Sequence, residues 1–138
     1  MTLTADSDLR QIFETCHTVA VVGCSPHPDR AGHYVARFLQ ERGYRVIPVN
    51  PGHKELLGER CYATLRDIPE NVDMVDCFRR PEHMPSVVDD AIAIGAKVVW
   101  MQLGVINQEA ANKAEAAGLK VVMNRCPLID YPRLFPER

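Results

Sequence analysis

Four clusters of small, polar and basic residues each follow a short apolar segment, and together they could bind a phosphorylated ligand. Glycine lets the backbone approach an anion, hydroxyl and amide groups supply hydrogen bonds, and Arg and Lys neutralise phosphate charge. A helix that starts after such a cluster would point its free N–H groups at the same phosphate. The residues that we expect to contact the ligand are Gly23, Cys24, Ser25, Arg30, Asn50, Pro51, Lys54, Phe78, Arg79, Arg80, Gln102 and Gly104.

The first cluster departs in two ways from the fingerprint of dinucleotide-binding folds. After Gly23 the chain reads Cys-Ser-Pro, where G-x-G-x-x-G would place a second glycine. The second apolar segment ends in Val49-Asn-Pro-Gly-His-Lys54, without the carboxylate that usually bonds the ribose of NAD. Both departures argue against an NAD(P)-binding oxidoreductase or NADH sensor, which is the alternative function on the same fold.

The chain carries no recognisable catalytic motif. It contains no Gly-x-Ser-x-Gly, no Gly-x-x-x-x-Gly-Lys-Ser/Thr and no His-Glu-x-x-His. Its histidines and its five cysteines are scattered, with no Cys-x-x-Cys pair and no metal-ligand spacing. This pattern indicates reduced thiols and no metal site. We therefore expect a binding protein rather than an enzyme.

Apolar segments that alternate with helical patterns must position these clusters. Short apolar runs typical of a buried parallel sheet predict strands at 19–23, 45–49, 73–78, 97–101 and 121–123. Apolar residues at helical spacing predict a helix before the first strand and helices between the strands. We predict an α/β fold with a Rossmann-like, doubly wound parallel sheet of five strands in the order 3-2-1-4-5. The carboxyl ends of its strands would gather the four clusters at one edge.

The whole chain, 1–138, is expected to form one domain. Its 138 residues are enough for one core, and 46% hydrophobic with 25% charged residues is ordinary for a globular protein. An amphipathic helix is expected within 1–17. The segment 124–138 contains three prolines and no periodicity, which predicts an irregular C-terminal tail.

Charge and hydropathy exclude several classes of partner. The net charge is −2, with both signs dispersed, so neither nucleic acid nor a membrane surface is an expected partner. No apolar run approaches the ~20 residues that span a bilayer. The N-terminus lacks the basic start and apolar core of a signal peptide, so we expect a cytoplasmic location.

Five segments occur in order at the expected strand ends, and as a set they identify a family resemblance. They are Val22-Gly-Cys-Ser-Pro-His-Pro-Asp-Arg30, Val46-Ile-Pro-Val-Asn-Pro51, Val75-Asp-Cys-Phe-Arg-Arg80, Val98-Val-Trp-Met-Gln-Leu-Gly104 and Met123-Asn-Arg-Cys-Pro127. The chain resembles the stand-alone coenzyme A binding domain proteins. Their fold is similar to that of the N-terminal domain of succinyl-CoA synthetase alpha subunits. The resemblance runs from about Val19 to Leu134.

The resemblance implies that the ligand is coenzyme A or an acyl-CoA, with its phosphates at the first loop and its nucleotide near 48–51. Coenzyme A carries a 3′-phosphate on its ribose, which a carboxylate would repel and a basic side chain would attract. We expect Lys54, Arg79 and Arg80 near that phosphate and Arg30 near the diphosphate.

The similar synthetases keep their phosphorylated histidine and nucleotide-handling domains outside the coenzyme A domain. The resemblance therefore implies a non-catalytic sensor, carrier or regulatory module. A protein partner or a homo-oligomer would fit such a module.

Several of these residues also have explanations that need no ligand. Gly23 can serve only the tight turn, Ser25 can cap the next turn, and Asn50-Pro51-Gly52 is a turn sequence in its own right. Arg79 and Arg80 can be a solvated pair. On this alternative the chain is an interaction subunit with a vestigial nucleotide pocket.

Two positions carry more specific expectations. Cys24 lies near the start of a helix, where a thiolate is stabilised, so a mixed disulfide with the coenzyme thiol is one hypothesis. Gly32 stands where similar proteins often carry serine, so a hydroxyl contact at the start of the helix would be lost.

Overall fold

The short apolar runs form a parallel sheet in the computed structural model, which describes residues 1 to 138. The strands of this sheet are β1 (Thr18–Val22), β2 (Arg45–Val49), β5 (Met74–Cys77), β6 (Val98–Met101) and β7 (Lys120–Met123). The helices are α1 (Asp6–Thr15), α2 (Ala31–Glu41), α3 (Met84–Ala93), α4 (Gln108–Ala116) and α5 (Pro127–Leu134). Two short 3₁₀ turns cover Leu65–Asp67 and Pro81–His83, and a small hairpin pairs β3 (Glu55–Leu56) with β4 (Glu59–Arg60).

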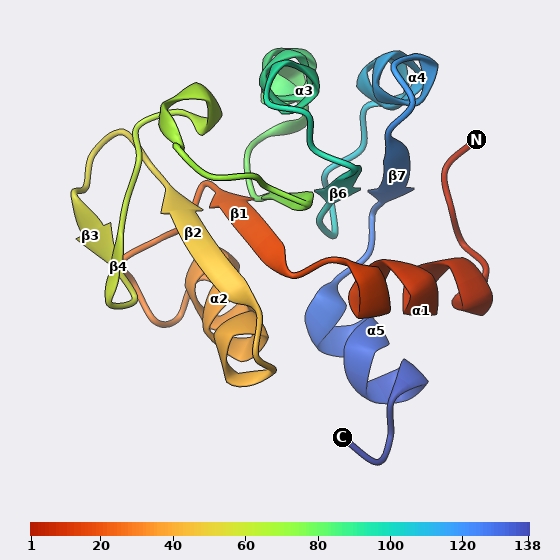
Figure 1. Ribbon diagram of the computed structural model, residues 1–138, viewed down its shortest axis with the longest axis horizontal. Coiled ribbons are helices and arrows are strands. Elements are labelled where there is room, and N and C mark those ends of the chain that lie inside the picture. Colours follow the sequence, from red (N-terminus) through yellow and green to blue (C-terminus); the bar gives the residue numbers. More distant parts are fainter.

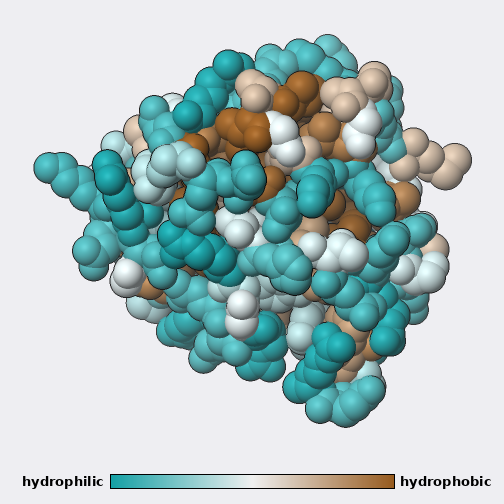
Figure 2. Space-filling model, in the orientation of Figure 1, coloured by the Kyte–Doolittle hydropathy of each residue, from teal (hydrophilic) through white to brown (hydrophobic).

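Helices cover both faces of the sheet, as expected for a Rossmann-like α/β domain. Figure 1 shows α3 and α4 on one face and α1, α2 and α5 on the other. Two separate apolar cores lie between these layers, one on each face of the sheet. The strands are buried almost throughout because both of their faces are covered. In the view of Figure 2 the surface is mostly hydrophilic, and its apolar side chains gather near α3 and α4.

The observed strand order is β2-β1-β5-β6-β7, so the predicted order 3-2-1-4-5 was wrong. The third major strand, β5, pairs with β1, whereas the prediction placed it beyond β2. Pro48 gives the physical reason. The Pro48 carbonyl faces the outer edge of β2, where it accepts a bond from the Tyr62 N–H at 3.1 Å, and its nitrogen has no hydrogen to offer at that edge. A strand with this proline is suited to an edge, where β2 is found.

In the observed strand order, the direction in which the chain progresses across the sheet reverses between β1 and β5. From β1 the chain crosses through α2 to β2 on one side, and it then returns past β1 to β5. Ligands of open parallel sheets bind beyond the carboxyl ends of the strands at this switch point. The loop after β1 therefore lies next to the loop after β5.

The C-terminal segment is helical, which corrects the expectation of an irregular tail. Pro127 is the first residue of α5, a position where its fixed φ and missing N–H are tolerated. Tyr131 and Phe135 pack against Phe13 of α1, with ring centroids 5.3 and 6.3 Å away. This aromatic packing stabilises α5 although the helix contains Pro132. None of the helices is long and apolar enough to cross a membrane.

Candidate functional site

Gly23 lies where the loops after β1 and β5 meet. Its φ is +84°, and its N–H donates to the Val49 carbonyl of β2 at 3.0 Å. A Cβ at this position would stand 2.8 Å from the carbonyl oxygen of Phe78 and 3.3 Å from Cγ of Arg79. Both the backbone conformation and this close approach therefore require glycine. The predicted residues Gly23, Phe78 and Arg79 are thus brought into contact.

The start of α2 is held directly against this loop. A Cβ on Gly32 would lie 2.6 Å from the carbonyl oxygen of Gly23, so no side chain fits there. The serine hydroxyl that similar proteins often carry at this position would have no room in this structure. Gly32 instead permits the close packing of helix on loop that a fingerprint glycine provides.

The first amides of α2 lack hydrogen-bond acceptors within the protein. The N–H groups of Ala31 and Gly32 donate to no acceptor in the protein, and Arg30 precedes the helix without a side-chain cap. The first turn contains no acidic residue. Unpaired amides at a helix start, together with the helix dipole, favour a negatively charged group.

The polar groups of Ser25 have partners in the loop and in the first turn of α2. Its hydroxyl oxygen accepts the His27 N–H at 3.1 Å, and its carbonyl oxygen lies 2.8 Å from Nδ1 of His33. The hydroxyl therefore caps its own turn, as the explanation without a ligand requires. His33, a residue that the sequence did not single out, is held against the same loop.

Asn50 joins the end of β2 to the first loop. Its Nδ2 donates to the Cys24 carbonyl at 2.8 Å, and its Oδ1 accepts the Gly52 N–H at 2.8 Å. The side chain thus organises both turns. Pro51 and Lys54 follow it in an exposed turn that leads to β3.

The basic candidates have few partners of opposite charge. Arg30, Lys54 and Arg79 are exposed and form no ion pair, and Arg80 lies 3.9 Å from Glu82 with its side chain 83% exposed. By contrast, Arg45 on the edge strand is held by two carboxylates, those of Glu59 and Glu70. The cations after β1, β2 and β5 therefore remain available to an anionic ligand.

An apolar cavity of about 270 Å³ adjoins the loops of β1 and β5. Phe78, Gln102 and the first residue of α2 contribute to its wall. Gly104 does not line it: with φ of +83°, this residue forms the turn beyond β6 and donates its N–H to Asn124 Oδ1 at 2.8 Å. The cavity is lined by Ala31, Tyr34, Phe78, Gln102, Leu103, Val105 and Cys126.

Cys24 lies at the carboxyl edge of the sheet, but its thiol points into the apolar core. The residue is fully buried, and burial raises the pKa of its thiol to about 12. A thiol in this environment stays protonated near neutral pH and is a poor nucleophile. The structure therefore argues against the mixed disulfide at Cys24, and only the backbone of this residue is available to a ligand.

The side chain of Gln102 forms a hydrogen bond with a buried carboxyl group. Its Nε2 donates to Oδ1 of Asp76 at 2.6 Å, and the two residues are 4% and 0% exposed. Burial raises the pKa of Asp76 to about 7, while the hydrogen bond from Gln102 opposes this rise. The sequence indicated Asp76 only as part of a longer segment, although a carboxyl group in a buried strand is itself a signal.

Sequence reasoning also missed most of the cavity wall. Cys126 follows β7, whose carboxyl end lies at the same edge of the sheet as those of β1, β2, β5 and β6. Ala31 and Tyr34 are three residues apart on α2 and share one helix face. The position of Cys126 after a strand and the three-residue spacing of Ala31 and Tyr34 can both be seen in the sequence.

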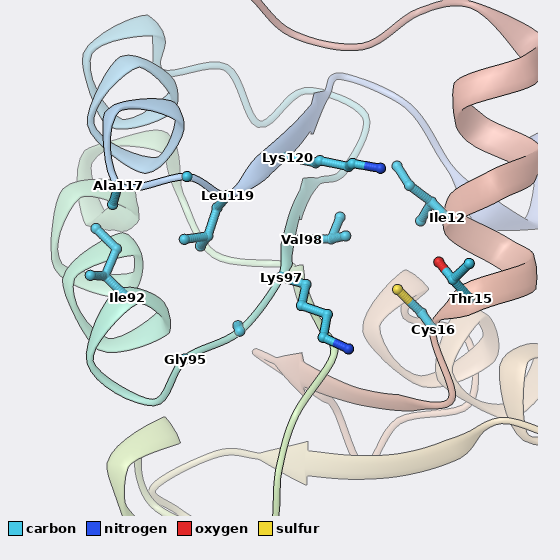
Figure 3. Close-up of a pocket in the computed structure, with 12 residues that line it drawn as sticks. Ile12, Thr15, Cys16, Ile92, Gly95, Lys97, Val98, Ala117, Leu119 and Lys120 are labelled. Carbon is cyan, nitrogen blue, oxygen red and sulfur yellow. The ribbon is translucent and has the colours of Figure 1, made fainter.

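A second hollow lies at the opposite edge of the sheet and contains none of the predicted residues. It has a volume of about 410 Å³ and lies between α1 and the amino ends of β6 and β7. Figure 3 shows Lys97 and Lys120 extending toward α1, near Ile12 and Cys16. Lys97 is 3.6 Å from Asp73, and Lys120 donates to Gln11 at 3.2 Å, so both ammonium groups already have partners.

Comparisons with known proteins agree with the resemblance seen in the sequence. The sequence model of a family described as "CoA binding domain" matches residues 17–132. The uncharacterized protein YneT of Bacillus subtilis is 37% identical over 120 residues, which cover 87% of this chain and 89% of YneT. A hypothetical protein from Pyrococcus horikoshii has a solved structure with a TM-score of 0.93 and 43% identity, covering 96% of this chain and 93% of that one.

A relative with a named activity is much longer than this chain. Acetate–CoA ligase [ADP-forming] I of Archaeoglobus fulgidus is 30% identical over 118 residues. The match covers 78% of this chain but only 17% of the ligase.

Proposed function

The chain belongs to the CoA binding domain family, and from this premise we propose that it binds coenzyme A or an acyl-CoA without turning it over. The proposal rests on three features that lie together at the carboxyl edge of the sheet. Free amides at the start of α2, unpaired basic side chains and an apolar cavity lie around the loops of β1 and β5. A ligand that joins phosphates to a long, largely apolar arm fits this combination.

The diphosphate would lie against the first loop. Gly23 and Gly32 bring loop and helix together, and the amides of Ala31 and Gly32 would donate to phosphate oxygens. Arg30 would add a charge-assisted contact from the residue before α2. The absence of any acidic residue in the first turn of the helix supports this arrangement.

The 3′-phosphate would lie near the remaining basic residues. Lys54 follows β2, and Arg79 and Arg80 follow β5, on either side of the loop after β1 in the sheet order. No carboxylate lies among residues 50–54, between the end of β2 and Lys54. This charge pattern favours coenzyme A over NAD, whose ribose at this position carries hydroxyl groups alone.

The pantetheine arm would enter the apolar cavity. Ala31 and Phe78 connect the phosphate loop to the cavity wall. A neighbouring hollow of about 220 Å³ shares Leu103 and Cys126 with the cavity and extends to Ile129 of α5. Leu103 and Ile129 are exposed, so this region could cover the acyl group of an acyl-CoA.

A binding role without turnover is supported by the chemistry of the edge. The thiol of Cys24 has a pKa raised by burial, and the Ser25 hydroxyl accepts a backbone hydrogen bond within its own turn. Neither side chain is paired with a general base, as an activated nucleophile requires. A sensor, carrier or regulatory module is the role that this edge supports.

Thermal unfolding in the presence of candidate ligands tests the proposal. A ligand that binds only the native chain raises its Tm, and at 100 times Kd the stabilisation is about 2.7 kcal/mol. We expect coenzyme A or acetyl-CoA to raise Tm, and NAD or NADH to have little effect. A larger rise with NADH would support the oxidoreductase or sensor alternative. No rise with any of them would support the interaction subunit with a vestigial pocket.

Incubation with acetyl-CoA tests the absence of turnover. We expect the thioester to persist for as long as it does in buffer. Protein-dependent release of free thiol, detected by chromatography, would show that the chain is an enzyme.

A further inference from the structure

Asp76 carries a fully buried carboxyl group, one of whose oxygens has no hydrogen-bond partner. It lies on β5, opposite Val21 of β1 and Trp100 of β6, in strands whose other buried residues are apolar. Its Oδ1 accepts the hydrogen bond from Gln102, and its Oδ2 is buried with no hydrogen-bond partner. An unsatisfied buried carboxyl oxygen costs a protein free energy and calls for an explanation.

No basic group compensates Asp76. The titratable groups that interact with it are the thiols of Cys24 from the first loop, Cys77 from β5 and Cys126 before α5. The nearby Trp100 Nε1 donates to the Arg125 carbonyl instead. The Arg125 guanidinium is itself engaged by Asp130. Asp76 is therefore not one half of a structural ion pair.

The bond to Asp76 fixes the orientation of the Gln102 amide. A carboxylate can only accept hydrogen bonds, so it selects the NH₂ group of Gln102. The amide oxygen Oε1 is then directed elsewhere. Gln102 Oε1 accepts no hydrogen bond from the protein. Unlike Asp76 Oδ2, it is not fully buried. Because Gln102 lines the apolar cavity, Oε1 is its available amide acceptor.

We propose that Asp76 and Gln102 form a specificity pair, in which Asp76 holds Gln102 Oε1 toward the cavity to accept an amide N–H of the pantetheine arm. This inference rests on the proposed function. Coenzyme A contains two secondary amides in that arm, whereas its adenosine 3′,5′-bisphosphate portion contains none. Gln102 touches the ligand, and Asp76 acts through Gln102 as a positioning residue.

The charge of Asp76 controls which group Gln102 presents. When the carboxyl group is ionised, Gln102 must donate to it and present its oxygen to the cavity. When Asp76 is protonated, its O–H can donate to the amide oxygen, and the amide can turn and present NH₂ instead. The pair then no longer favours an N–H donor. Affinity for the arm should accordingly be greater above neutral pH than below it.

Binding of two ligands to matched variants tests the pair. Isothermal titration would compare coenzyme A with adenosine 3′,5′-bisphosphate, which carries the same 3′-phosphate but no arm. We expect Gln102→Leu to weaken coenzyme A about fivefold to tenfold, the loss of one hydrogen bond, and to leave the bisphosphate unchanged. The control is Gln108→Leu, a change of the same kind on the exposed face of α4, which should alter neither affinity.

A pH profile of Asp76→Asn gives a second readout, which also applies if Gln102→Leu fails to fold. The ratio of the two affinities should favour coenzyme A severalfold more at pH 8 than at pH 6 in the wild-type chain, measured relative to the same ratio in Asp76→Asn. The 5′-phosphate of the bisphosphate is a monoester that also titrates in this range. Its ionisation affects both chains alike and cancels when the wild-type chain is compared with Asp76→Asn.

The outcomes separate the two proposals. Wild-type binding of coenzyme A, with equal effects of Gln102→Leu on both ligands or no effect on either, would overturn the specificity pair and leave the proposed function intact. A ratio that changes with pH equally in the wild-type chain and in Asp76→Asn would overturn the role of Asp76. Failure of the wild-type chain to bind coenzyme A would overturn the proposed function, and the pair with it.

Discussion

Asn50 Nδ2 donates a hydrogen bond of 2.8 Å to the carbonyl oxygen of Cys24, and this bond joins the end of β2 to the loop after β1. The Asn50 N–H also donates to Tyr62, whose own N–H donates to Pro48. Asn50 therefore joins the first loop to the edge strand through its side chain, and it joins the edge strand to the segment after the β3–β4 hairpin through its backbone. The shape of the candidate phosphate site depends on it.

Replacing Asn50 should loosen the loop. We expect Asn50→Ala to lower the free energy of unfolding by about 1–2 kcal/mol, because the Cys24 carbonyl loses its partner. Coenzyme A affinity should fall as well. The control is Asn112→Ala, which removes an exposed amide on α4 that bonds only Gln108. Urea unfolding and titration would measure both effects, and wild-type binding by Asn50→Ala would show that the loop does not depend on this bond.

Gly32 should not tolerate even a methyl group. Its Cβ would clash with the Gly23 carbonyl, so we expect Gly32→Ala to cost about 1–3 kcal/mol of stability and to weaken coenzyme A binding. Gly43 offers a control, because it has φ of +96° but open space around it. Gly43→Ala should cost about 1 kcal/mol and leave affinity unchanged. Equal affinities of the two variants would mean that the packing of helix on loop does not shape the site.

Arg30 should contribute to binding of the diphosphate. We expect Arg30→Ala to weaken coenzyme A about tenfold and to leave adenosine, which has no phosphate, unaffected. Arg37→Ala removes an exposed arginine from α2, the helix that Arg30 precedes, and should change neither affinity. Equal loss for coenzyme A and adenosine on replacing Arg30 would show that the diphosphate lies elsewhere.

Asp76 should make the protein less stable as pH rises. Burial raises its pKa to about 7 in the folded chain, against about 3.9 when unfolded. Between these values the folded chain holds a proton that the unfolded chain has lost, so stability falls as pH increases and levels off above about pH 7. Asp76→Asn should remove this slope in urea unfolding between pH 5 and 8. An unchanged slope would mean that Asp76 titrates normally.

Asp73 should show the opposite dependence and serves as the comparison. Burial raises the pKa of Asp73, but the N–H groups of Thr18 and His17, at 3.0 and 2.8 Å, outweigh it and lower the pKa overall. Its stabilising contribution is present above about pH 4 and is lost as pH falls through the folded pKa. The deficit of Asp73→Asn relative to wild type should therefore shrink in acid.

Cys24 should be unreactive in the native protein. Its buried thiol has a pKa raised to about 12, so iodoacetamide at pH 7.5 should leave it unmodified until the chain is unfolded in urea. Peptide mass spectrometry would locate the modified cysteines. A reducible mass gain of coenzyme A on Cys24 after oxidation would instead revive the mixed disulfide.

The sequence was sufficient to predict the strands of the main sheet but not their order. Alternation of apolar runs with helical patterns located the strands of the sheet, as at β1, expected at 19–23 and found at Thr18–Val22. Strand order depends on which edges can pair, and the decisive signal was a single residue, Pro48. The tail was expected to be irregular because it has three prolines and no periodicity, whereas Pro127 in fact begins α5.

The candidate site was predicted through the clusters that end its strands, and Gly23, Phe78 and Arg79 do meet. The sequence does not show which way a side chain points. Cys24 follows its strand, as the other candidate residues follow theirs, but its side chain points into the core. The role of Asp76 depends on a contact with Gln102 across 26 residues of sequence, which no local pattern encodes.

Isothermal titration of the reduced protein with coenzyme A, and with dephospho-coenzyme A and NAD as comparators, tests the central claim most directly. The basic residues after β2 and β5 predict that coenzyme A binds, that removal of its 3′-phosphate weakens binding about tenfold or more, and that NAD binds weakest. Equal affinities for coenzyme A and dephospho-coenzyme A would contradict the assignment of the basic residues. Absence of coenzyme A binding would contradict the proposed function itself.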